Sequence, residues 1–229
     1  MKFAVVILSG VMTLSGCASF RTAAPGDPIE PINRGIYSFN STFDHYLLKP
    51  IAKGYDAVVP GLVKTGVSNA FQNMSDAQSL VSDALQLKGT KFGDDFGRVL
   101  LNTTFGIGGI FDLATQLGIA RGDEDIGQTL GYWGIGAGPY LVIPFLGPSS
   151  LRDAVGRFGD SKVNPLAYVS SVPVRNSLTG LSIVNARVGL FPAENLLNQA
   201  SLDRYTFLRS AYLQRRQSLV LDGKRPKDE

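Results

Sequence analysis

The side chains that most often carry out catalysis are scarce in this sequence. Its 229 residues include one histidine, His45, and one cysteine, Cys17. Any Ser–His–Asp triad or histidine-based metal site would have to use His45, and neither Gly-x-Ser-x-Gly nor His-Glu-x-x-His occurs. His45 stands next to Tyr46 near a predicted helix end, where exposed and capping roles are far commoner than catalysis. The sequence therefore indicates a protein that is not an enzyme and that uses no metal and no cofactor.

Two other short stretches bear a superficial likeness to binding motifs. Gly134-Ile135-Gly136-Ala137-Gly138 is rich in glycine like a phosphate loop, but it lacks the preceding strand, the Gly-x-Gly-x-x-Gly spacing and a following Lys-Ser/Thr. The acidic run 123–125 is better explained as a solvated turn than as a cation site. Neither stretch predicts nucleotide or metal binding.

Cys17 has a different chemistry. The chain begins with Lys2, an apolar run over residues 3–14 and the sequence Leu-Ser-Gly-Cys ending at Cys17. A charged start, a short apolar segment and small residues at the end form a secretory signal, and the last four residues resemble the bacterial lipobox, which is cut before its cysteine. We expect Cys17 to be lipidated. Ala18 follows it, where lipoproteins retained at the inner membrane typically have Asp, so the outer membrane is favoured.

Composition limits the remaining possibilities. Acylation of Cys17 leaves no thiol for a disulfide, so the domain must depend on its core. The formal net charge of +3 includes Lys2, and about +2 remains after processing, too little to predict nucleic-acid binding. We expect a signal peptide at 1–16, a lipidated tether at 17–26, one helical domain at 27–221 and a disordered tail at 222–229.

The segment 126–151 has no charged side chain until Arg152. It is long enough to cross a bilayer, which takes about 20 apolar residues. Its many glycines and prolines cost a helix about 1 and 3 kcal/mol each, so a straight spanning helix is excluded. Irregular backbone survives at membrane depth only when it is buried in protein or lines a wet cavity. The segment is therefore either a buried loop core or a cavity wall beside lipid.

Apolar periodicity predicts helices around this segment. The first should begin with Asp27 as its cap, Pro28 in its first turn and Glu30 completing a capping box, and should end near Leu48 because Pro50 follows. Its apolar face could lie in a membrane interface or face a core, and the pattern does not choose between them.

Further helices are predicted along the rest of the chain. Residues 61–86 read as two helices that meet near Ser75, with Gly89 as the closing cap. A charge-free hairpin over 99–111 is too short to span a bilayer but long enough to enter one leaflet. Ser149 or Ser150 should cap a short helix, residues 173–190 should form another, and Ser201 should cap the last. No strand alternation is convincing, so the fold class is mostly α, a single domain with glycine-rich corners.

Several motifs together resemble one family. They are Asp27-Pro28-x-Glu30-x-x-Asn33-Arg34, Asn102-Thr103-Thr104-x-Gly106-x-Gly108-Gly109-x-x-Asp112, Gly127-Gln128-Thr129-Leu130-Gly131-x-x-Gly134-x-Gly136-x-Gly138-Pro139-Tyr140, Pro144-x-x-Gly147-Pro148-Ser149, Arg152-Asp153 and Asp203-x-Tyr205-x-x-x-Arg209-x-x-Tyr212. In this order they are similar to the MlaA (VacJ) family of outer-membrane lipoproteins, over nearly the whole mature chain. The short acidic-basic tail is the main departure.

The resemblance implies a helical, ring-like structure embedded in the inner leaflet of the outer membrane, with a central amphipathic channel. Such proteins remove phospholipid misplaced in the outer leaflet, pass it to a soluble periplasmic carrier of the MlaC type and associate with trimeric porins. The expected location is the periplasmic face of the outer membrane. Candidate channel residues are Asn102, Tyr132, Trp133, Gly134, Gly136, Gly138, Pro139, Tyr140 and Arg175. The alternatives are a porin-bound scaffold without a channel and, with less support, a lipid hydrolase.

Overall fold

A computed structural model describes residues 27–200 and 203–224 of the chain. The predicted signal peptide, the tether with Cys17, the predicted cap Ser201 and residues 225–229 lie outside this range. None of the described helices combines the length and the apolar character that crossing a bilayer requires.

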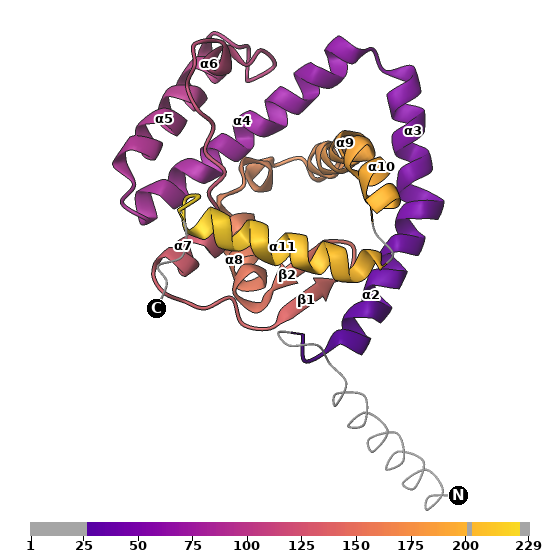
Figure 1. The fold of residues 1–229 in the computed structure, drawn as a ribbon. Coiled ribbons are helices and arrows are strands. Elements are labelled where there is room, and N and C mark those ends of the chain that lie inside the picture. The colour runs from indigo at the N-terminus through magenta and orange to yellow at the C-terminus, as the bar shows by residue number, and fades with distance from the viewer. Residues whose placement is uncertain (1–26, 201–202, 225–229) are drawn as a thin grey trace, which may run out of the picture.

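Helices make up most of the described chain and follow one another around a ring (Figure 1). In chain order the elements are α2 (Glu30–Phe43), a π-helical turn η2 (Asp44–Leu48), α3 (Lys49–Val58), α4 (Gly61–Leu85), α5 (Gly89–Thr104), α6 (Leu113–Gln116), α7 (Ile126–Tyr132), β1 (Tyr140–Ile143), β2 (Gly147–Ser150), α8 (Leu151–Val163), the 3₁₀ turn η3 (Pro165–Tyr168), α9 (Val172–Gly189), α10 (Phe191–Ala200) and α11 (Arg204–Val220). The predicted fold class, a mostly helical single domain, is confirmed.

The first helix does not stop at Leu48, so that prediction was wrong. The chain passes from α2 through η2 directly into α3, with Pro50 in the first turn of α3. Proline lacks an N–H and its ring presses on the carbonyl four residues earlier. The wider π-helical turn just before Pro50 absorbs this crowding, so the helical rod continues to Val58.

Asp27 does not cap α2, contrary to the prediction. The helix begins at Glu30 with Ile29 at the cap position and no side-chain cap bond. The Asp27 carboxylate is instead buried, where it accepts hydrogen bonds from Asn33 Nδ2 (2.8 Å), Tyr205 Oη and Arg209 Nη1 (3.2 Å). The Asp27 carboxylate therefore takes part in a tertiary hydrogen-bond network and does not cap its own helix.

Residues 61–85 form the single helix α4, so the predicted break near Ser75 is also wrong. The Ser75 hydroxyl donates to the Phe71 carbonyl (3.2 Å), and the helix accommodates it. Gly89 is not the closing cap: Leu87 takes the left-handed position (φ 58°), and the Lys88 N–H closes the end on the Asp83 carbonyl (3.0 Å). Gly89 begins α5 instead.

The glycine-rich corner after α5 contains a close backbone approach. Gly109 has φ +91°, and a Cβ there would lie 2.5 Å from the Cβ of Asn73 on α4. The predicted second arm of this hairpin is short, because α6 covers only Leu113–Gln116.

A short antiparallel hairpin, β1–β2, corrects the expectation that the chain has no strands. Tyr140 pairs with Ser150 and Ile143 with Gly147 around a three-residue loop in which Phe145 has φ 63°. As predicted for one of the two serines, Ser150 caps α8 by accepting the Asp153 N–H (3.2 Å). The cap of α11 is Asp203.

Ion pairs attach the end of the described chain to the helical domain. The carboxylate of Asp222 binds Lys88 (2.7 Å) and Lys91 (2.6 Å). The contacts of the helical domain thus extend past the boundary expected at residue 221.

Candidate functional site

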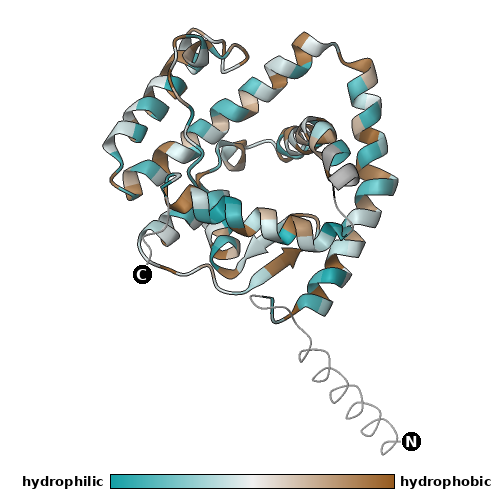
Figure 2. Cartoon of the chain, in the orientation of Figure 1, coloured by the Kyte–Doolittle hydropathy of each residue, from teal (hydrophilic) through white to brown (hydrophobic). Residues whose placement is uncertain are grey.

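The described chain places polar side chains inside and apolar side chains outside. Its fully buried apolar residues are only Ala52, Ala114, Tyr140, Val142 and Tyr205, and the buried polar and charged residues outnumber them several-fold. Many large apolar side chains are exposed instead, and Figure 2 shows apolar residues interspersed with polar ones along the helices of the ring. On α5 and in the segments on either side of α6 these are Phe92, Phe96, Leu100, Phe105, Ile107, Ile110, Phe111 and Leu117. Apolar surface of this extent marks contact with a membrane or another protein.

Helix α4 shows how this arrangement arises. Its buried side chains include a polar series at about three-residue spacing, Asn73, Asp76, Ser79, Ser82, Asp83 and Gln86, whereas Leu62, Val63 and Leu85 are exposed. The helix is amphipathic, but its polar face is the one that packs.

The candidate site is centred on the end of α7 and the segment after it, which we call the glycine loop (residues 133–139). Tyr132 and Trp133 are 47 % and 60 % exposed, and Gly134, Gly136 and Gly138 are exposed as well. Trp133 Nε1 donates to the Leu85 carbonyl at the end of α4 (3.1 Å). The aromatic pair is therefore presented to the surroundings from a fixed position.

The three glycines of the loop differ in what they require. Gly134 and Gly138 have φ +91° and +67°, a conformation that disfavours other residues. Gly136 has no left-handed φ, and a Cβ built on it meets nothing within 4 Å. Gly136 thus faces open space, and its backbone conformation does not require glycine.

Backbone hydrogen bonds fix the glycine loop to α8. The N–H groups of Leu151 and Arg152 donate to the carbonyls of Pro139 and Ala137, each at 3.1 Å. The loop is irregular, but these backbone hydrogen bonds fix its conformation.

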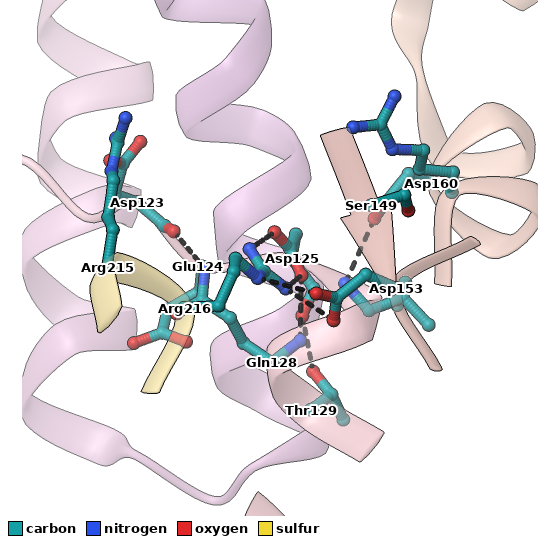
Figure 3. A network of polar contacts seen from close by, with 12 residues as sticks. Asp123, Glu124, Asp125, Gln128, Thr129, Ser149, Asp153, Asp160, Arg215 and Arg216 are labelled. Atoms are coloured by element: carbon teal, nitrogen blue, oxygen red, sulfur yellow. Dashed lines mark hydrogen bonds and ion pairs between the residues drawn. The ribbon is translucent and has the colours of Figure 1, made fainter. Parts of the chain in front are cut away.

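At the start of α7, Arg216 of α11 joins this helix to α8 (Figure 3). Its Nη2 lies 2.9 Å from Asp125 Oδ1 and 2.9 Å from Asp153 Oδ1, and the Tyr212 hydroxyl donates to Asp153 Oδ2 (2.6 Å). Burial disfavours ionisation of Asp153, but hydrogen bonds from Arg216 and Tyr212 outweigh it and lower its pKa to about 2. A Cβ on Gly127 would lie 2.7 Å from Asp153 Oδ1, so this glycine gives the network its room.

The structure does not bring all of the predicted candidates to the surface. Tyr140 is buried against Tyr205 and Tyr212, and burial raises its pKa to about 12. Asn102 is buried in the α5–α6 corner, where its amide donates to Asp112 Oδ1 (3.1 Å) and accepts the Ala114 N–H (3.0 Å). The side chains of Tyr140 and Asn102 therefore lie inside the protein, where they hold the neighbouring backbone in place.

Arg175 lies on α9, which packs against α3 and α4. It is half-buried, and its guanidinium makes no ion pair or hydrogen bond to any residue of the described chain. Arginine side chains of this kind are suited to bidentate hydrogen bonds with carboxylate and phosphate groups.

Two supporting residues went unnoticed as site residues, Asn33 and Asn40 on α2. Their side-chain amides bond to β1 and to the hairpin turn: Asn33 Nδ2 to the Tyr140 carbonyl (3.0 Å) and Asn40 Nδ2 to the Ile143 carbonyl (2.9 Å). Their spacing of seven, which puts them on one helix face, was the available signal.

Known proteins with similar sequences place the chain in one family. The chain matches the MlaA lipoprotein family over residues 25–219. It is 34 % identical over 220 residues to the intermembrane phospholipid transport system lipoprotein MlaA of Escherichia coli, covering 93 % of this chain and 87 % of that one. The Haemophilus influenzae protein of the same name is 31 % identical over 231 residues, with 97 % and 92 % covered.

A protein of Rickettsia bellii is 33 % identical over 213 residues, covering 93 % of this chain and 82 % of its own. Among solved structures, one described as the structural basis for maintenance of bacterial outer membrane lipid asymmetry superposes with a TM-score of 0.74. It is 32 % identical and covers 85 % of this chain and 98 % of its own.

Proposed function

This chain belongs to the MlaA lipoprotein family, and from that premise we propose that it removes misplaced phospholipid from the outer leaflet of the outer membrane. It passes the lipid to a soluble periplasmic carrier for retrograde transport and so maintains outer-membrane lipid asymmetry. Family relatives named for phospholipid transport, and the similar structure described in terms of lipid asymmetry, support the proposal.

One observation carries the proposal: many large apolar side chains are exposed, while most of the buried side chains are polar or charged. An exterior rich in Phe, Ile and Leu is stable against acyl chains and would be poorly soluble in water. A charged headgroup cannot cross hydrocarbon cheaply unless polar groups replace its water. A protein seated in one leaflet with this arrangement can offer a polar path to the headgroup while the tails remain in lipid.

The proposed path passes the glycine loop. Tyr132, Trp133, Gly134, Gly136 and Gly138 line it, Pro139 and Tyr140 hold the backbone of the loop in place, and Asn102 fixes the α5–α6 corner. The unpaired guanidinium of Arg175 meets the lipid phosphate, for which the planar fork of arginine is suited. Lipid moves to the carrier with a decrease in free energy, so the step needs neither a cofactor nor a covalent reaction.

In this proposal the lipid-modified Cys17 anchors the protein to the periplasmic face of the outer membrane. A trimeric porin holds it in the leaflet, and a carrier of the MlaC type receives the lipid. The competing function is a porin-bound scaffold that moves no lipid itself.

Lipid transfer in a defined system tests the proposal. Purified acylated protein is placed in liposomes that contain labelled phospholipid, the soluble carrier is added, and carrier-bound label is measured. We expect carrier-bound label to exceed that from protein-free liposomes several-fold, with the lipid intact. No excess over protein-free liposomes would favour the scaffold, and release of free fatty acid would instead favour a hydrolase.

A further inference from the structure

Two buried carboxyl groups meet between α4 and α5. Asp83 on α4 and Asp95 on α5 are both 0 % exposed, and their side chains lie within hydrogen-bonding distance of each other. Gly122 further encloses Asp95, because its N–H donates to Asp95 Oδ1 (2.9 Å). A Cβ on Gly122 would lie 2.2 Å from Asp95 Oδ2, so only glycine leaves room for the carboxyl there.

The remaining oxygens of this pair have no donor. Apart from each other's carboxyl group, both oxygens of Asp83 and Oδ2 of Asp95 are buried without a hydrogen-bond partner in the described chain. An ionised carboxylate only accepts hydrogen bonds, whereas a protonated one also donates. Two carboxylates in contact therefore satisfy each other only if one of them carries a proton.

The cations nearby are already engaged elsewhere. Lys91 of α5 faces Asp83, but it binds Glu124 (2.6 Å) and Asp222 (2.6 Å), and Glu124 itself faces Asp83. Arg98 of α5 and Asp76 of α4 face Asp95, and they bind each other (3.0 Å). Helix α7, which also packs on α4, contains no charged residue. No cation in this set is left to neutralise a second negative charge.

We propose that Asp83 and Asp95 form a proton-binding site whose bound proton holds α5 against α4, and whose proton loss as the surroundings become alkaline loosens this contact. The site is independent of the proposed lipid path. It links ambient pH to the position of α5 and of the corner that carries the exposed residues Phe105 and Ile107.

The direction of titration agrees with this geometry. Burial and the hydrogen bond to Asp95 raise the pKa of Asp83 to about 7, and burial raises the pKa of Asp95. The unfolded chain loses these protons near pH 4, so between about pH 4 and pH 7 the folded state binds more protons. Stability must then fall as pH rises through this window and level off above it.

The test uses the full-length protein in detergent micelles and measures unfolding in urea from pH 5 to pH 8. For wild type we expect the unfolding equilibrium constant to rise by up to about tenfold per pH unit below pH 7. In Asp83→Asn an amide replaces the proton as donor, so this dependence should flatten. Asp94→Asn changes an exposed neighbour on α5 and should behave like wild type. Equal pH dependence in wild type and Asp83→Asn would overturn the proposal.

A second measurement applies even if Asp83→Asn fails to fold. Infrared spectra of folded wild type should contain the carbonyl band of a protonated carboxylic acid at pH 5.5 and lose it by pH 8.5. Hydrogen exchange, corrected for its intrinsic pH dependence, should accelerate in α5 over the same interval while α11 stays protected. A spectrum without the band at pH 5.5, or α5 exchange unchanged with pH, would refute the proton site.

Discussion

The amide of Asn33 lies beside β1 in the position that a neighbouring strand would take. It donates to the Tyr140 carbonyl (3.0 Å) and accepts the Val142 N–H (2.9 Å). Two turns further along α2, Asn40 repeats the pattern by donating to the Ile143 carbonyl (2.9 Å) and accepting the Phe145 N–H (2.8 Å). Two side chains of one helix thus satisfy the free edge of the hairpin and hold the end of the glycine loop.

Asn33→Ala should therefore destabilise the domain. It leaves a buried carbonyl and a buried N–H unpaired, at about 1–3 kcal/mol for each such group. The half-buried Asn69, whose exposed hydrogen bond goes to the Ile110 carbonyl, provides a matched control as Asn69→Ala. Urea unfolding in detergent measures both variants, and equal midpoints would contradict the role given to Asn33.

Asp27→Ala should be costlier than loss of a helix cap. It removes the common acceptor of Tyr205 and Arg209, and breaking a buried charge pair typically costs about 3–5 kcal/mol. The helix cap Asp203, removed as Asp203→Ala, should cost about 1 kcal/mol. If Asp203→Ala lowered thermal stability more than Asp27→Ala, the role given to Asp27 in the buried network would be contradicted.

The sequence predicted where helices occur better than which way they face. Periodicity located most helices of the ring, although not α3 or α7. On α4, however, the series through Asp76 and Gln86 is buried while Leu62 and Val63 are exposed. The rule that apolar faces point inward assumes water outside, and that assumption does not apply to a protein beside lipid. Local rules also fail where a tertiary partner competes, as Tyr205 and Arg209 do for Asp27.

The hairpin escaped prediction for a related reason. A four-residue strand such as Tyr140–Ile143 is apolar without alternation, and its edge partners, Asn33 and Asn40, lie about a hundred residues earlier. Among the candidate residues, the glycine loop was located by its composition, whereas the burial of Asn102 and Tyr140 depends on contacts that no local pattern reveals.

Cys17→Ser should abolish lipid modification and maturation. A single acyl chain gives only marginal membrane binding and stable attachment takes at least two signals, so the variant should also leave the outer-membrane fraction. Metabolic labelling with fatty acid followed by fractionation measures both effects. Label that remains on the Cys17→Ser protein would rule out this residue as the acylation site.

Gly136→Leu is the sharpest test of the glycine loop. Because Gly136 has open space and no left-handed φ, leucine should be accommodated with a stability change within about 0.5 kcal/mol. Transfer of labelled lipid to the carrier should nevertheless fall at least tenfold, while Gly136→Ala retains it.

Two further variants control that experiment. Gly54→Leu adds the same side chain at another open position, on α3, and should transfer lipid normally. Gly134→Leu should instead lose stability, because φ +91° disfavours a side chain. Undiminished transfer by folded Gly136→Leu would remove this position from the lipid path.

Acid should weaken the joint between α7, α8 and α11. The pKa of Asp153 is lowered to about 2, so its contribution is present above about pH 4 and is lost as pH falls toward 2. Arg216→Gln should lower the urea midpoint at pH 6 and make it less sensitive to acid. Arg215→Gln, which removes an exposed pair with Asp123, should change little. Identical behaviour of these two arginine variants would contradict the assigned role of Arg216.

The hydrogen bonds that Tyr205 and Arg209 donate to Asp27 join residues 178 and 182 positions apart. A contact between the two ends of a chain has the largest loop-closure entropy that the chain can present, and contacts of this separation form slowly. We therefore expect the contact between α11 and the start of α2 to form late in folding and to complete the ring (Figure 1). Until this contact forms, the apolar side chains belong to an open chain, and we expect aggregation to be most severe at that stage.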